Sequence, residues 1–219
     1  MSSLVFQTEE QQVFVATDTL AVTPSGRPLT FTSKALILPH LRMIVAGTGS
    51  GGFLDRWFVY INSRMRVLGI DNLNQHTTSN LIPGWEAQKK EFSLPVSATT
   101  TVYHFGFSEN TGRIRSYAYR SENQFLHEEL GYGFGIKPPC SIPDAYELPR
   151  DLRKMMDEQR RAELSKPDGE TRIYIGGEII VHHLTANGFM VYPFDRFEDY
   201  DSDRRIIFQS APDGALRAV

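Results

Sequence analysis

The sequence has 219 residues, a single cysteine and a net charge of −3 at pH 7. This length suffices for one large domain with a substantial core, and one cysteine excludes an intramolecular disulfide framework. A pI near 6.1 gives no electrostatic attraction to nucleic acid or to an anionic membrane. No apolar run approaches the roughly 20 residues that span a bilayer, and the first residues lack the pattern of a secretion signal, so we expect a cytoplasmic protein.

Ser2, Asp18 and Lys34 stand at equal spacing along the first part of the chain. If Met1 is removed, Ser2 becomes the first residue and carries a free α-amine. An α-amine titrates near pH 8, so it can act at neutral pH as the base that activates its own serine hydroxyl. Lys34 would hold that amine neutral by charge repulsion, and Asp18 would pair with Lys34 and orient it.

The flanking residues predict short strands and one helix. The apolar run at residues 13–16 predicts a buried strand, and Asp18 follows its end. A turn at residues 24–28 leads to a returning strand at 29–34, and residues 41–46 predict another buried strand. Glycines at 47–52 precede a helix predicted over 53–66, whose buried face includes Phe53, Trp57, Tyr60, Ile61 and Met65.

The second half of the chain predicts two hairpins and a helix. Residues 99–107 and 114–119 form the arms of one hairpin, residues 148–164 a helix, and residues 179–181 with Asn187-Gly188 the last hairpin. Residues 71–93 are polar, with a short helix expected at 85–92. We expect a single domain over 1–219, in which residues 195–219 form a C-terminal extension.

The order of these features resembles a known family. An N-terminal hydroxyl residue, the segment VFVATD, a lysine after a turn and a strand ending Ala46-Gly47 are similar to the catalytic β-type subunit of the proteasome and its bacterial relatives. These are N-terminal-nucleophile hydrolases. The resemblance implies an α+β fold, a four-layer αββα sandwich of two antiparallel sheets between helix layers. It places Ser2 as nucleophile, Asp18 and Lys34 as its supporting pair, and the Gly47 N–H as an oxyanion donor.

The resemblance also implies an activity and partners. We expect hydrolysis of peptide or other amide bonds, assembly into stacked homo-oligomeric rings, and an ATP-dependent unfoldase as partner. No cofactor is expected. No metal is expected either, because His182 and His183 point to opposite faces of their strand and no histidine has zinc-like spacing with Cys140.

Three positions depart from the family pattern. The family's supporting serine between two glycines falls on Tyr132, its supporting aspartate on Arg172 and a second serine on Ile175. Their loss supports an alternative, a ring or scaffold subunit that keeps the sandwich and has lost the chemistry.

A second alternative is a dinucleotide-binding protein. Gly47, Gly49 and Gly52 match the GxGxxG fingerprint between a strand and a helix, and residues 67–71 would be the next strand, ending in a ribose-binding Asp71. Such folds need repeated strand–helix alternation, whereas hairpins follow Asp71. The sequence therefore favours the hydrolase over the dinucleotide site.

Overall fold

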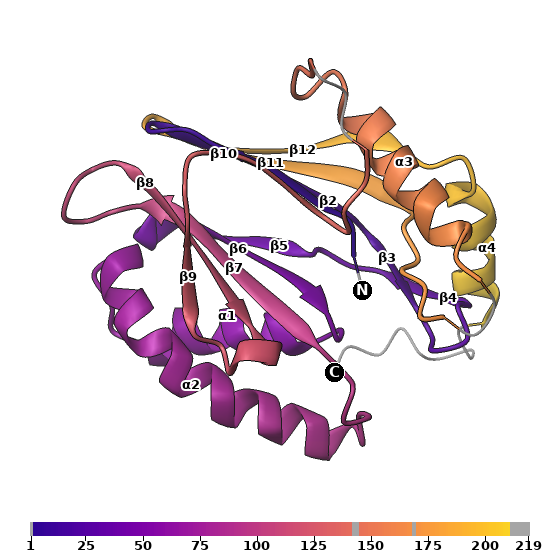
Figure 1. The fold of residues 1–219 in the computed structure, drawn as a ribbon, viewed down its shortest axis with the longest axis horizontal. Coiled ribbons are helices and arrows are strands. Elements are labelled where there is room, and N and C mark those ends of the chain that lie inside the picture. Colours follow the sequence, from indigo (N-terminus) through magenta and orange to yellow (C-terminus); the bar gives the residue numbers. More distant parts are fainter. Residues whose placement is uncertain (1, 142–144, 168–169, 211–219) are drawn as a thin grey trace.

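Two five-stranded antiparallel sheets form the centre of the protein (Figure 1). The computed structural model describes residues 2–141, 145–167 and 170–210. The first sheet has the order β10-β1-β2-β11-β12, with β1 (Leu4–Thr8), β2 (Gln12–Asp18), β10 (Gly133–Lys137), β11 (Glu178–Thr185) and β12 (Gly188–Arg196). The second has the order β5-β6-β7-β8-β9, with β5 (Ala35–Leu38), β6 (Met43–Gly49), β7 (Thr100–Phe107), β8 (Ile114–Arg120) and β9 (His127–Leu130). A separate hairpin pairs β3 (Leu20–Val22) with β4 (Pro28–Phe31).

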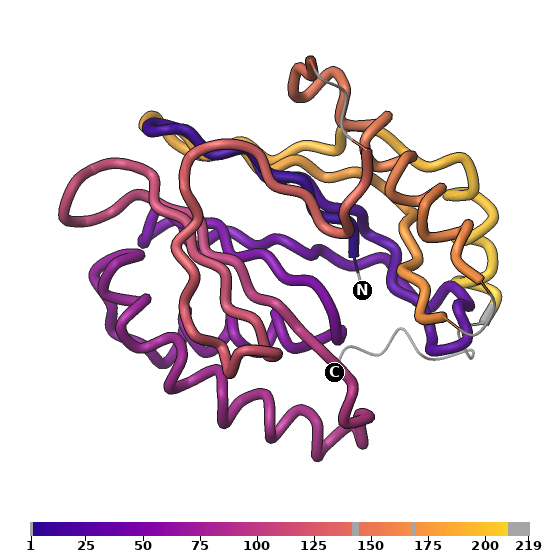
Figure 2. Tube along the Cα trace, in the orientation of Figure 1, coloured from indigo at the N-terminus to yellow at the C-terminus, as the bar shows by residue number. Residues whose placement is uncertain are grey.

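Helices cover the outer faces of the sheets. The pair α1 (Phe53–Arg64) and α2 (Ile70–Glu91) packs on the second sheet, and α3 (Leu152–Leu164) packs on the first. A fourth helix, α4 (Tyr200–Ser210), lies against β4 at one end of the sandwich. The tube in Figure 2 shows the two sheets as separate layers between these helices. The expected four-layer αββα sandwich is therefore confirmed.

Three apolar clusters hold these layers together. The largest joins α1 and α2 to the second sheet, another fills the space between the sheets, and the third joins α3 to the first sheet. Between the sheets, the Phe6 ring of β1 lies 5.0 Å from the Phe105 ring of β7. Each sheet is thus buried on both faces, which explains the continuous apolar run at residues 13–16.

Helix α1 matches its prediction closely. Phe53, Trp57 and Ile61 recur every four residues and are buried against the second sheet. Tyr60 belongs to the rim of that face, because its hydroxyl donates to the Asn80 side chain of α2 at 2.9 Å. The helix ends at Arg64, two residues earlier than predicted.

Helix α2 differs most from its prediction. The sequence predicts only a short helix at residues 85–92, whereas α2 is a single helix of 22 residues. Its buried positions recur at helical spacing and include the polar side chains of Thr77 and Gln88. Pro83 lies inside the helix. The polar residues on the buried face weaken the hydrophobic periodicity from which a helix is predicted.

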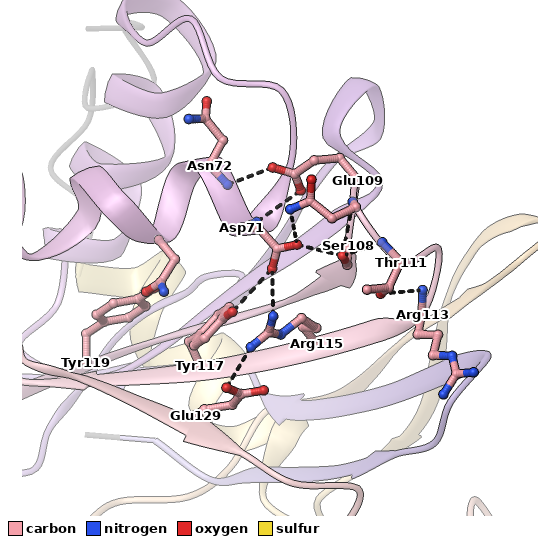
Figure 3. Close-up of polar contacts among 12 residues, drawn as sticks. Asp71, Asn72, Ser108, Glu109, Thr111, Arg113, Arg115, Tyr117, Tyr119 and Glu129 are labelled. Atoms are coloured by element: carbon pink, nitrogen blue, oxygen red, sulfur yellow. Dashed lines mark hydrogen bonds and ion pairs between the residues drawn. The ribbon is translucent and has the colours of Figure 1, made fainter.

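A polar cluster fixes the start of α2 to the β7–β8 turn (Figure 3). The Glu109 carboxylate accepts the backbone N–H groups of Asp71 at 3.0 Å and Asn72 at 2.7 Å. The Asp71 carboxylate accepts the Ser108 hydroxyl at 2.6 Å and the Tyr117 hydroxyl at 3.3 Å. The two bonds to Glu109 satisfy N–H groups that have no partner within the helix itself.

The last described segments, β11, β12 and α4, are part of the folded domain. The expected last hairpin is present as β11 and β12. Residues 195–210, expected to form part of an extension, include the buried Phe197 and α4. Residues 211–219 lie outside the described residues. Within the described part of the chain, no helix has the length and apolar character needed to cross a bilayer.

Candidate active site

Ser2 lies at the entrance to β1, between the two sheets. Its exposed fraction is 6%. It lines a cavity of about 110 Å³ together with β3, the segment before β5, and the loop that joins β6 to α1. Lys34 and Gly47 line the same cavity. The structure therefore brings Ser2, Lys34 and Gly47 to one place, as the sequence predicts.

The Asp18 carboxylate organises the residues around this cavity. Its Oδ1 accepts the backbone N–H of Ser3 at 2.8 Å, and its Oδ2 accepts the Lys34 ammonium at 2.8 Å. The backbone N–H of Gly176, just before β11, also donates to Oδ2 at 3.2 Å. Asp18 is fully buried as the last residue of β2. One carboxylate thus fixes the chain start and the lysine relative to each other.

Lys34 is a buried ammonium with two acceptors. Besides Asp18, its Nζ donates to the carbonyl oxygen of Leu20 at 2.6 Å. Burial lowers the pKa of Lys34, and the negative charge of Asp18 opposes that change. The lysine is thus held in a fixed position at the cavity that Ser2 also lines.

Gly47 is close-packed, and its N–H has a partner. An added Cβ would lie 3.0 Å from the Cβ of Leu54, so the strand approaches α1 closely at this point. The Gly47 N–H donates to the carbonyl oxygen of Lys34 at 3.0 Å. Its role as an oxyanion donor stays a prediction, and it would require that this N–H be shared with the reacting carbonyl.

Gly49 presents a second backbone N–H to the cavity. N–H groups two residues apart in a strand point to the same side, so the Gly49 N–H points to the same side as that of Gly47. On that side the pairing of β6 with β5 ends at Ala35, and Gly49 lines the cavity with Ser2.

Gln159 is a site residue that the sequence does not reveal. This fully buried side chain of α3 accepts the Ser3 hydroxyl at 2.5 Å and donates to the Pro138 carbonyl at 2.6 Å. It ties the chain start to α3 and to the loop after β10. A lone glutamine in a charged helix gives no sequence signal of such a role.

The family's three supporting positions lie elsewhere in this protein. Tyr132 is 55% exposed and lines an open groove between β9 and β10. Arg172 donates to the Lys166 carbonyl, and Ile175 is buried against α3. In the described residues none of the three lines the Ser2 cavity.

The dinucleotide hypothesis is wrong. The glycines at 47–52 do join a strand to a helix, but that strand belongs to a fully antiparallel sheet. Residues 67–69 form no strand, and Asp71 lies in the first turn of α2. Asp71 is hydrogen-bonded within the polar cluster of Figure 3, to side chains of β8 and of the β7–β8 turn. Gly52 instead begins α1, with a φ of 80° that favours glycine.

The described residues contain no group of three or more His, Cys, Asp or Glu side chains that could hold a metal ion. His182 is buried, and His183 bonds the Gln12 side chain at 3.0 Å, so the two histidines have separate environments.

Comparisons with known proteins give structural neighbours alone. No protein-family model matches the sequence, and no curated protein matches it. The fold is similar to that of Anbu (ancestral beta-subunit) from Yersinia bercovieri, with a TM-score of 0.59 and 10% identity over 94% of this chain and 92% of that one. Anbu from Hyphomicrobium sp. strain MC1 gives a TM-score of 0.57 at 12% identity over 94% and 92% of the two chains. A Gly-1 mutant of that protein gives 0.60 at 12% identity over 95% and 93%.

These findings correct the expected family assignment. The sequence resembles the proteasome β-subunit-like N-terminal-nucleophile hydrolases, but no model of any family matches it, so the assignment to that family is wrong. Its structural neighbours are Anbu proteins at 10–12% identity, a likeness that establishes shared architecture and not family membership. The chain therefore has the proteasome-like four-layer fold that Anbu has.

Proposed function

We propose that this protein is a proteasome-related hydrolase subunit that cleaves peptide or other amide bonds with Ser2 as an N-terminal nucleophile. The observation that carries the proposal is the buried connection from Ser3 through Asp18 to Lys34 at a cavity that Ser2 lines. The proposal requires that Met1 be removed so that Ser2 carries a free amine.

In the proposed reaction, the Ser2 hydroxyl oxygen attacks the carbonyl carbon of the substrate amide while its proton passes to the α-amine. The resulting oxyanion would accept a hydrogen bond from the N–H of Gly49 or Gly47. Breaking of the C–N bond releases an amine, which takes the proton from the α-ammonium, and an ester on Ser2 remains. The α-amine of Ser2, which is neutral again, then deprotonates a water molecule that hydrolyses the ester. The ammonium of Lys34 stabilises the negative charge in both halves of the reaction.

The first experiment measures the N-terminus and the activity together. Intact mass spectrometry should show a chain that begins at Ser2, and fluorogenic peptide amides should be cleaved. Ser2→Ala should lower kcat/KM by at least about a thousandfold while the protein stays folded. Ser63→Ala, the same change at an exposed site in the last turn of α1, is the matched control. Undiminished cleavage by Ser2→Ala would refute the mechanism.

A non-catalytic subunit is the second candidate function. Two observations favour a non-catalytic subunit. The Gly47 N–H already donates to the Lys34 carbonyl, and among the described residues that line the cavity there is no Tyr132, Arg172 or Ile175. It predicts that Met1 is retained, or that no amide probe is cleaved by the wild-type chain.

We also propose that the chain assembles with copies of itself, since the expectation of rings rests on the resemblance to proteasome subunits. Light scattering coupled to size-exclusion chromatography should then give a mass several times the 24.8 kDa of one chain. A mass of one chain at micromolar concentration would contradict assembly. An ATP-dependent unfoldase partner stays a prediction.

A further inference from the structure

Lys137 is a second lysine beside Ser2 that the proposed reaction does not use. It is the last residue of β10 and pairs with Leu4 of β1. Its Nζ donates to the hydroxyl of Thr101, at the start of β7, at 2.8 Å. The side chain therefore reaches from the first sheet to the second at the edge where Ser2 enters the sandwich. Ser2 and Lys137 both line a cavity of about 30 Å³.

The two lysines differ in how their charges are balanced. Lys34 forms an ion pair with Asp18 at 2.8 Å, so this pair carries no net charge. Within the described part of the chain, no carboxylate lies within ion-pair distance of Lys137, whose hydrogen-bond partner is the neutral Thr101 hydroxyl. Nearby Arg120 is itself paired with Glu128 at 3.0 Å.

We propose that Lys137 is a positioning residue of the Ser2 site, whose ammonium keeps the Ser2 α-amine in its neutral, basic form. The inference rests on the proposed function, because only a free α-amine can respond to this charge. A positive charge close to an amine disfavours protonation of the amine and lowers its pKa. The amine can then accept the hydroxyl proton at a lower pH.

The other charges at the two cavities act in both directions. Asp18 and Lys34 act in opposite directions and largely cancel. Asp55 of α1 lines the larger cavity, and as a carboxylate it would raise the pKa of the amine. Burial, together with the nearby charge of Arg120, lowers the pKa of the Lys137 ammonium, and the charges of Glu122 and Glu128 oppose that change. Among the described residues that line the two cavities, Lys137 is therefore the lysine without an ion-pair partner, and its charge favours a neutral amine.

The experiment titrates the Ser2 amine without a substrate. Periodate cleaves the bond between the amine-bearing and hydroxyl-bearing carbons of an N-terminal serine, and it reacts with the neutral amine. The oxidation rate of the processed full-length protein, followed by intact mass between pH 5 and 9, reports the fraction of neutral amine. We expect Lys137→Gln to raise the midpoint of this profile by about one pH unit. Lys137→Arg, which keeps the charge, should retain the wild-type midpoint.

Two further variants control for effects of the introduced side chain and of the net charge of the protein. Lys137→Met keeps the apolar stem and should show the same upward shift as Lys137→Gln. Lys154→Gln removes the same charge from an exposed position on α3 and should leave the midpoint unchanged. The acid limb of the pH profile of kcat/KM should move with the periodate midpoint.

The outcomes separate this inference from the proposed function. Equal midpoints in the wild type, Lys137→Gln and Lys137→Met would overturn the role of Lys137 and leave Ser2 as nucleophile. A protein that retains Met1, and so does not undergo this carbon–carbon cleavage, would overturn the proposed function and the role of Lys137 with it.

Discussion

At the scale of single residues, Asp18 binds three donors from distant parts of the chain. Its carboxylate is also the counter-ion of the buried Lys34 ammonium. Asp18→Asn removes that charge and leaves the ammonium buried without a counter-ion, although the Leu20 carbonyl still accepts its hydrogen bond. We expect the free energy of unfolding, measured in urea, to fall by about 3–5 kcal/mol.

The double variant Asp18→Asn/Lys34→Met is the control for this prediction. It removes the unpaired charge as well, so most of the lost stability should return. If the double variant is less stable than Asp18→Asn alone, the cost does not come from the buried ammonium.

His104 makes a second prediction at this scale. It is fully buried on β7, and its Nε2 accepts the indole N–H of Trp57 at 2.8 Å. Burial lowers the pKa of His104 to about 3. Between that pH and about 6.5, the unfolded chain binds a proton that the folded protein does not. Stability should therefore fall as the pH is lowered through this range, by up to about 1.4 kcal/mol per pH unit.

The measurement for His104 is the free energy of unfolding between pH 4 and 7. His104→Gln keeps an acceptor for Trp57 and removes the titration, so its profile should be flatter than that of the wild type. His40→Gln, at an exposed histidine before β6, should retain the wild-type slope. Identical slopes in His104→Gln and the wild type would contradict the prediction.

The candidate site could be predicted from the sequence only in part. Ser2, Asp18 and Lys34 lie close together in sequence, and one hairpin and its flanking strands suffice to bring them together. Gln159 is 156 positions from its partner Ser3, and Lys137 reaches Thr101 across two sheets. Such contacts depend on how the layers stack, which local patterns do not encode.

At the scale of elements, the start of α2 depends on a residue outside the helix. Glu109 accepts two of the helix's first N–H groups, and its negative charge lies at the positive end of the helix dipole. Glu109→Ala should lower the free energy of unfolding by about 1 kcal/mol, measured by chemical denaturation. Glu86→Ala, at an exposed ion pair within the same helix, should cost less than about 0.5 kcal/mol. Equal costs at the two positions would argue against the cap.

Helix α2 also shows what the sequence pattern lacks. Its buried face combines Ile70, Leu73, Leu81 and Trp85 with polar Thr77 and Gln88. Gln88 donates to the Gly51 carbonyl at 3.2 Å, a contact with the glycine-rich loop at the start of α1. Polar side chains on a buried face are stable where they find such partners, and those partners are unknown before the fold is known. Helix α1 and the strands β2, β6, β7 and β8 are predicted from their apolar pattern alone, whereas β1, β5, β9 and β10 are not predicted from the sequence.

At the scale of the whole molecule, one apolar cluster joins the two sheets, and each sheet shares a further cluster with the helices on its outer face. We propose that residues 2–210 unfold as one domain. Trp57 and Trp85 both lie in the cluster under α1 and α2 and report that layer by fluorescence, whereas far-UV circular dichroism reports every layer. The urea midpoints of the two signals should coincide.

Phe6→Ala, in the cluster between the sheets, should lower both midpoints equally and cost about 3–5 kcal/mol. If Phe6→Ala shifts the dichroism midpoint and leaves the fluorescence midpoint in place, the helix layer with the tryptophans folds independently of the first sheet, and the single-domain proposal is wrong.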